Sequence, residues 1–285
     1  MTKKRFLRMV FLGIRQIRDP YYQGFAAQLS FYFICSIVPI VIMMSQLLVQ
    51  LFHLTPMDVV GWLLQVNNET ISQNPLFSQI KEILQSSLTA SSFTNVVYIF
   101  VALWAASGAQ FSLMRISNFM YTEGRTTGKG YFRERFRAII TMVIFIVIIV
   151  LALLALLYGG QLLQTRFHMD GTVWTVIRWP ISFILYVLMI SFQYYMMPSD
   201  RLSVKNIIPG SIFASVGMVI VSMIYALLFG YRNGSGFSVY GMLTNIIAVM
   251  IWFYILAWVL TLGMLFNKVW MDTENGADEA YYIFD

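Results

Sequence analysis

The sequence predicts an all-α integral membrane protein: a bundle of six transmembrane helices with an N-terminal interfacial helix and short extracytoplasmic amphipathic helices. Of its 285 residues, 59% are hydrophobic and only 11% are charged, whereas about 25% of the residues in a soluble domain are charged. Six apolar segments each reach the roughly 20 residues that a helix needs to cross a bilayer. These segments are residues 25–52, 93–118, 136–159, 174–197, 206–230 and 239–268.

The regions outside these segments complete a single membrane domain over residues 1–285. Residues 1–20 read as a cationic helix on the cytoplasmic leaflet, because their apolar residues recur on one helical side. The external segment 53–92 contains two proline-marked helix starts, which predict two short amphipathic helices. Residues 269–285 form an acidic tail. The apolar side of the first helix consists of Phe6, Leu7, Val10, Phe11, Ile14 and Ile17.

The distribution of positive charge predicts the orientation. Most of the 19 Lys and Arg residues lie before the first span, after the second, after the fourth or at the end of the sixth. Cytoplasmic loops of membrane proteins carry such an excess, so we predict that both termini are cytoplasmic. The same rule accounts for the net charge of +6, and we therefore predict no nucleic-acid partner. The positive residues of the opposite side are Lys81, Arg166, Arg178 and Arg232.

Polar residues of the first span gather on one helical stripe. A stripe of amides facing lipid would be costly, so this one should face protein or water. Pro39 lies on the stripe, removes a backbone donor near mid-span and is a candidate hinge. Ser36 flanks it. The stripe consists of Gln28, Tyr32, Cys35, Pro39, Gln46 and Gln50.

Uncharged polar residues also recur on faces of the fourth, fifth and sixth spans. One interpretation is that the polar faces of these spans and the first enclose a polar, uncharged cavity or groove. The other is that they form hydrogen bonds between helices, each worth about 0.6 kcal/mol. Small residues predict close helix packing at Gly210, Ala214, Gly217 and Gly241. The candidate pathway-lining residues are Gln28, Tyr32, Ser36, Gln46, Gln193, Ser215 and Asn245.

The sequence offers no recognisable catalytic chemistry. All 13 acidic residues lie outside the predicted spans, and both histidines lie near outer edges of spans. Proton relays and many ion-coupled carriers use carboxylates or histidines within the membrane. There is also no clustered metal-ligand set, no P-loop and no nucleophile–base pair at a known spacing. We predict that the protein is not an enzyme and has no catalytic residue, metal or cofactor.

Short motifs follow one another in a characteristic order along residues 19–270. Their residues are Ala26, Ala27, Phe31, Tyr32, Ser36, Pro39, Trp104, Ser107, Asn118, Tyr121, Arg133, Arg135, Pro209, Gly210, Tyr240, Gly241, Trp252, Tyr254, Gly263 and Asn267. This order resembles the YihY/virulence factor BrkB family of bacterial inner-membrane proteins, formerly labelled ribonuclease BN. One departure is Leu265, because the family usually has an acidic residue two positions after the glycine of the last span.

The resemblance implies a multi-pass protein of the bacterial cytoplasmic membrane. Family members have been linked to serum resistance and to the export of lipopolysaccharide lipid or envelope function, and the residues above give no support to the ribonuclease label. We therefore expect a transporter or translocator of a lipid or other amphiphile that contributes to the cell envelope. The alternatives are a non-transporting scaffold or envelope-assembly partner and a membrane-bound nuclease. The partners would be membrane lipids or an amphiphilic substrate, and a homo-oligomer or protein partner is left open.

Overall fold

The structure is a computed structural model, and the part of it that is described is helical. It contains no strand within the described residues, so the all-α prediction is confirmed for them. The two external helices predicted within segment 53–92 lie outside the described residues. The described residues are 3–18, 20–52, 92–122, 130–167, 171–199, 202–234 and 241–274.

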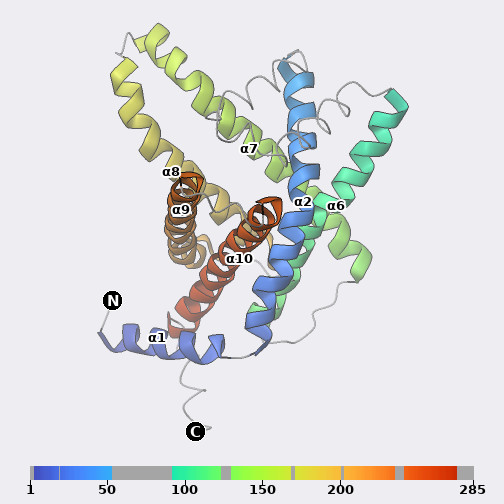
Figure 1. Cartoon of the computed structure of the whole chain (residues 1–285). Coiled ribbons are helices and arrows are strands. Elements are labelled where there is room, and N and C mark those ends of the chain that lie inside the picture. Colours follow the sequence, from blue (N-terminus) through green and yellow to red (C-terminus); the bar gives the residue numbers. More distant parts are fainter. Residues whose placement is uncertain are drawn as a thin grey trace. The chain divides into compact units, whose positions relative to one another are not determined.

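Seven helices account for almost all of these residues (Figure 1). Four of them, α7 to α10, contain a stretch long and apolar enough to cross a membrane. The other two long helices, α2 and α6, have 33 and 30 residues. The count of six spans and the orientation of the termini stay predictions. The helices are α1 (Lys3–Ile17), α2 (Pro20–Phe52), α6 (Ser92–Tyr121), α7 (Tyr131–Phe167), α8 (Gly171–Met196), α9 (Val204–Gly234) and α10 (Gly241–Glu274).

Some helices run past the predicted ends of the spans. The α2 helix begins at Pro20 rather than at residue 25, which suits a residue whose ring presets the dihedral angle of a first helical turn. The α10 helix continues to Glu274 and takes in the start of the predicted tail. The reason is packing, because Val269 and Trp270 lie in an apolar cluster with α1. Hydropathy marks only the part of a helix that lipid covers.

The chain divides into two compact units, which are described separately. The first contains Met1–Phe31, Ser112–Tyr131 and Ala152–Asp285, and the second contains Tyr32–Phe111 and Phe132–Leu151. Helices α2, α6 and α7 each contribute to both units. The assignment of residues 1–285 to a single membrane domain stays a prediction.

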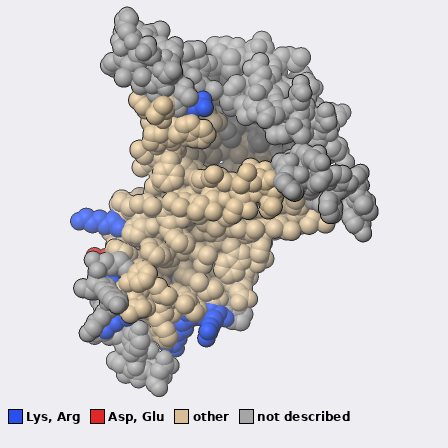
Figure 2. Space-filling model, turned by 60° about the vertical axis from the view of Figure 1, so that its left-hand side comes forward, with Lys and Arg blue, Asp and Glu red and all other residues tan. Residues whose placement is uncertain are grey.

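Charged residues are sparse on the described surface. On the face drawn in Figure 2, most of the described surface is uncharged, and only a few Lys and Arg side chains lie on it. Large apolar side chains are exposed along the long helices, among them Leu151, Ile184 and Leu227. An exposed apolar surface of this kind fits lipid rather than water.

The amphipathic helix α1 packs against the C-terminal end of α10 (Figure 1). Met9 and Leu12 are buried in a cluster with Leu265 and Val269. Most of the residues predicted to form the apolar side are exposed, namely Phe6, Leu7, Val10, Phe11 and Ile14. The helix therefore packs mainly through the neighbouring side, together with Ile17, and most of its apolar side stays exposed enough to contact the lipid layer.

Arg5 fastens α1 to the end of α10. Its Nη2 donates to the carbonyl oxygen of Trp270 at 3.2 Å and its Nε to the hydroxyl of Thr273 at 3.5 Å. The guanidinium also lies 4.5 Å from the centroid of a Trp270 ring and 3.8 Å from the carboxylate of Glu274. Several weak contacts thus meet at one side chain.

Arg5→Ala should loosen α1 without unfolding the long helices, because it removes these contacts and leaves the apolar cluster intact. We expect faster hydrogen–deuterium exchange across Lys3–Ile17 in detergent, by about fivefold for a loss near 1 kcal/mol. Arg8→Ala, at an exposed position of the same helix, is the matched control. Equal exchange in the wild type and Arg5→Ala would show that the cluster alone holds α1.

Candidate functional site

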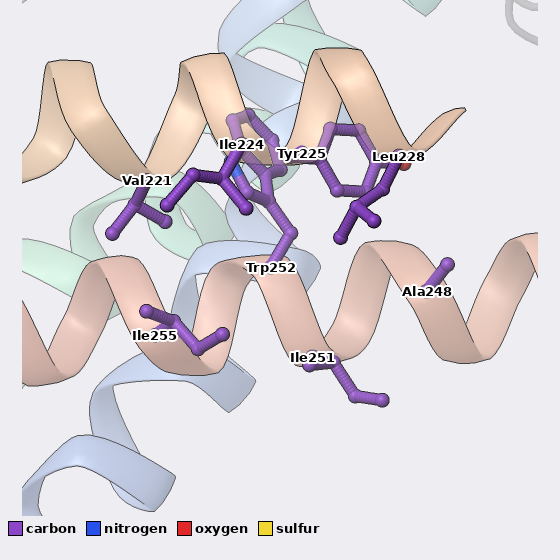
Figure 3. Close-up of a pocket in the computed structure, with 8 residues that line it drawn as sticks. All are labelled: Val221, Ile224, Tyr225, Leu228, Ala248, Ile251, Trp252 and Ile255. Carbon is purple, nitrogen blue, oxygen red and sulfur yellow. The ribbon is translucent and has the colours of Figure 1, made fainter. Parts of the chain in front are cut away.

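The first unit contains an apolar cleft between α9 and α10. Its volume is about 350 Å³, which lies in the range of about 300–1,000 Å³ of small-ligand pockets. No charged residue lines it. Figure 3 shows both helices and the residues between them. The cleft is lined by Val221, Ile224, Tyr225 and Leu228 of α9 and by Ala248, Ile251, Trp252 and Ile255 of α10.

Glycines bring α9 and α10 together at the other end of their contact. A Cβ atom on Gly210 would clash with the carbonyl oxygen of Gly263, and one on Gly217 would lie 2.8 Å from Cγ1 of Val259. The main chain of one helix therefore almost touches the other in this part. Beyond Gly217 the residues of α9 that face α10 are larger than glycine and keep the helices apart. Ala248 of α10 is too small to fill the space opposite them, so a cavity remains between the helices.

One polar group in the cleft has no partner among the described residues. The indole Nε1–H of Trp252 is buried and makes no hydrogen bond with any of them. Trp252 reaches from α10 toward α9 (Figure 3), where its ring stacks on Tyr225 with centroids 5.1 Å apart and planes 26° apart. A buried donor without an acceptor is costly. The cleft therefore suits a mainly apolar ligand that carries an oxygen acceptor.

The rim of the cleft is aliphatic and open to the side. Ile224 and Ile251 are about half exposed, at 51% and 53%, and Leu228 is 67% exposed. In a bilayer, side chains of this kind contact acyl chains rather than water. A ligand could thus enter the cleft laterally from the lipid.

The predicted pathway residues of the first unit lie in different environments. Gln193 is buried, and its Oε1 has no hydrogen-bond partner within the part of the chain that the structure describes. Ser215 is buried but donates to the carbonyl oxygen of Ser211 in its own helix, at 2.7 Å. Gln28 is exposed, and the side chain of Asn245 lies outside the described residues.

The predicted residues of the second unit begin with Ser36, which links α2 to α6. Its hydroxyl donates to the carbonyl oxygen of Ala105 at 3.3 Å. Tyr32 fits against Gly108, where a Cβ atom would lie 3.0 Å from the Tyr32 ring. Pro39 lies within the continuous helix α2, and the side chain of Gln46 lies outside the described residues.

Of the predicted pathway residues whose side chains the structure describes, none lines the α9–α10 cleft, and the role of the whole set as a pathway stays a prediction. The interpretation of the sequence looked for uncharged polar residues and did not identify the aliphatic residues that line the cleft. An alanine one turn from a tryptophan, opposite a tyrosine on the neighbouring helix, is the signal that could have found the cleft.

Away from the cleft, polar side chains of the first unit connect its segments by hydrogen bonds to backbone atoms. Asn267 Oδ1 accepts from the Gly210 amide at 2.6 Å, and the Tyr194 hydroxyl donates to the Leu260 carbonyl at 2.8 Å. Asn118 Oδ1 accepts from the Ser199 amide at 2.8 Å.

Tyr121 joins the same region from the end of α6 by donating to the Met264 carbonyl at 3.4 Å. Burial, aided by the negative charge of Asp272, raises the pKa of Tyr121 well above its usual range, and a hydrogen bond with Asn267 opposes that shift. The phenol therefore stays a neutral donor at physiological pH.

The described residues contain no group of three or more His, Cys, Asp and Glu side chains that could hold a metal ion.

Comparison with known proteins gives a family for the chain. The family model for virulence factor BrkB matches residues 14–281. The ribonuclease-like protein YfkH of Bacillus subtilis (strain 168) is 26% identical over 268 residues, which cover 91% of this chain and 94% of YfkH. No solved structure matches the chain. With nearly its whole length matched, the chain belongs to the virulence factor BrkB family.

Proposed function

We propose that the protein translocates a lipid or another amphiphile in the bacterial cytoplasmic membrane and that the α9–α10 cleft holds the apolar part of that molecule. The observation that carries the proposal is the cleft itself. It measures about 350 Å³, is lined by apolar side chains and holds one buried donor that has no acceptor in the described part of the chain. An acyl chain supplies the apolar surface and an ester or phosphate oxygen supplies the acceptor.

The predicted topology indicates which half of the bilayer contains the cleft. With cytoplasmic termini, α9 begins on the cytoplasmic side, so Val221–Leu228 and Ala248–Ile255 belong to the outer half of the bilayer. Polar groups for the head group would come from the predicted pathway, with Pro39 as a hinge. The pathway residues of this proposal are Gln28, Tyr32, Ser36, Gln46, Gln193, Ser215 and Asn245.

Filling the cleft tests this function. Ala248→Phe places a phenyl ring in the cavity and should lower the amount of co-purified lipid by at least about tenfold, the effect of about 1.4 kcal/mol on an equilibrium. Movement of labelled phospholipid across liposome membranes should fall with it. The measurements are lipid mass spectrometry on purified protein and a fluorescence assay of lipid movement in liposomes.

Ala226→Phe is the matched control, because Ala226 lies exposed on α9 and does not line the cleft. It should retain both bound lipid and lipid movement. Trp252→Phe keeps an aromatic ring but removes the N–H donor. It should therefore weaken the binding of ester-linked lipids more than the binding of plain hydrocarbons. Lipid movement at the wild-type rate by Ala248→Phe would refute a role for the cleft.

The pathway residues need a separate test. Gln28→Leu combined with Gln46→Leu should abolish lipid movement but leave the protein folded and lipid in the cleft. Normal movement by this double variant would remove the polar stripe from the proposal.

The same assays separate the other candidates. If the protein is a scaffold, the Ala248→Phe variant should still support the envelope even though it no longer binds lipid. The name of the Bacillus relative points to RNA cleavage, so the purified protein should also be tested on RNA. Cleavage that persists through purification and is lost with the same variants would favour a nuclease.

A further inference from the structure

The first turns of α7 carry an arginine that is almost wholly buried. Arg135 keeps 8% of its surface exposed. Its Nη2 donates to the carbonyl oxygen of Trp104 in α6 at 2.7 Å. The guanidinium lies 4.5 Å from the ring centroid of Trp104 and 5.3 Å from that of Phe111. All these residues belong to the second unit, whereas the residues of the α9–α10 cleft belong to the first.

The protein groups that the structure describes leave this charge largely uncompensated. The Trp104 carbonyl is shared, because the Ser107 hydroxyl also donates to it at 2.8 Å. The Nε atom of Arg135 is buried without a hydrogen-bond partner. Within the described part of the chain, no carboxylate lies within ion-pair distance of Arg135. A buried cation in this state is costly unless an anion is supplied.

Exposed aromatic rings accompany Arg135 in the first turns of α7. The start of α7 exposes three aromatic rings, Tyr131, Phe132 and Phe136, at 54%, 85% and 65%. Aromatic residues with neighbouring arginines are typical of the membrane–water interface. The positive end of the helix dipole lies at the same place and favours an anion. The observations therefore favour a negatively charged group beside Arg135.

We propose that Arg135 binds the phosphate group of an anionic membrane lipid. The planar guanidinium matches a phosphate group, and two N–H groups can donate to two phosphate oxygens. The aromatic rings hold the guanidinium and flank the glycerol and acyl parts of the lipid. Inorganic phosphate offers the same chemistry, so the lipid source needs its own test.

Lipid titration followed by native mass spectrometry tests the proposal. The intact protein in neutral detergent is titrated with dioleoylphosphatidylglycerol and, separately, with zwitterionic dioleoylphosphatidylcholine. The wild type should prefer the anionic lipid. Arg135→Gln should weaken phosphatidylglycerol binding about tenfold, whereas Arg133→Gln, at an exposed neighbour, should weaken it by less than about twofold. Arg135→Lys keeps the charge but loses the fork and should fall between them.

Three results would overturn the proposal. The first is phosphatidylglycerol binding that Arg135→Gln leaves unchanged. The second is an equal loss with Arg133→Gln, which would mean a diffuse basic surface. The third is inorganic phosphate binding that depends on Arg135 while the two lipids bind alike, which would replace the lipid by free phosphate. If Arg135→Gln does not fold, the lipid preference of the wild type and the affinity of Arg135→Lys still test the proposal. Equal affinity of the wild type for both lipids would then overturn it.

Discussion

Gly210→Ala should break the contact between α9 and α10. The added Cβ would clash with the carbonyl oxygen of Gly263 and with the side-chain oxygen of Asn267. A backbone carbonyl cannot rotate away as a flexible side chain can, so the helices have to separate. Separation also strains the 2.6 Å hydrogen bond from the Gly210 amide to Asn267. We expect the free energy of unfolding to fall by about 1–3 kcal/mol, the cost of overpacking a tight core.

Gly24→Ala is the control that separates packing from helix propensity. Gly24 lies within α2, and a Cβ atom there would have no neighbour within 4 Å. Alanine favours a helix over glycine by about 1 kcal/mol, so Gly24→Ala should be neutral or stabilising while Gly210→Ala destabilises. Unfolding in mixed detergent micelles, followed by circular dichroism, measures both. Equal stability of the two variants would show that α9 and α10 do not meet through Gly210.

The helical extents were predictable because a bilayer restricts them. A span needs about 20 apolar residues and must satisfy its backbone within the helix. The predicted fifth span, residues 206–230, falls within α9 (Val204–Gly234), and the fourth nearly coincides with α8 (Gly171–Met196). The ends beyond the apolar core depend on tertiary contacts, as the extension of α10 beside α1 illustrates.

The packing face of α2 was harder to predict. In the first unit, the buried residues near its start are Ala26, Leu29 and Ser30, whereas the amide of Gln28 is exposed. Polarity alone cannot distinguish a residue that faces a partner helix from one that faces a water-filled groove. Small residues give the better signal for contact, because they let helix backbones approach closely.

The cleft escaped prediction for a related reason. Side chains such as Ile224 and Ile251 look the same in a sequence whether they face lipid or line a cavity that opens to lipid. The cavity exists because Ala248 is small and because the glycine contact at Gly210 fixes the spacing of the helices farther along. Both conditions depend on which residues of two helices face each other, which one sequence does not specify.

The residues that carry the family resemblance acquire a physical role in the first unit. Gly210 and Gly263 allow the backbones of α9 and α10 to meet. Asn118, Tyr121 and Asn267 each bond to a backbone atom of another segment. These motif residues therefore hold helices in register, and they need not take part in any chemistry.

Leu265 is where the chain departs from the family's usual acidic residue, and the structure explains what leucine does there. It is 3% exposed and lies in the cluster with Met9, Leu12 and Val269. An acidic side chain at this position would bury a charge among apolar groups. The leucine thus permits α1 to pack on α10 as it does here.

Leu265→Glu should release α1 from α10, because a buried carboxylate without a partner costs several kcal/mol. Hydrogen–deuterium exchange across Lys3–Ile17 should then approach that of an unprotected helix, a larger effect than that of Arg5→Ala. Leu265→Met, which conserves volume, should keep α1 protected, and Leu265→Gln should fall between. Lowering the pH should reduce the loss, since a neutral carboxyl group costs less to bury. Full protection in Leu265→Glu would instead mean that Lys268, one helical turn away and 3% exposed, compensates the carboxylate.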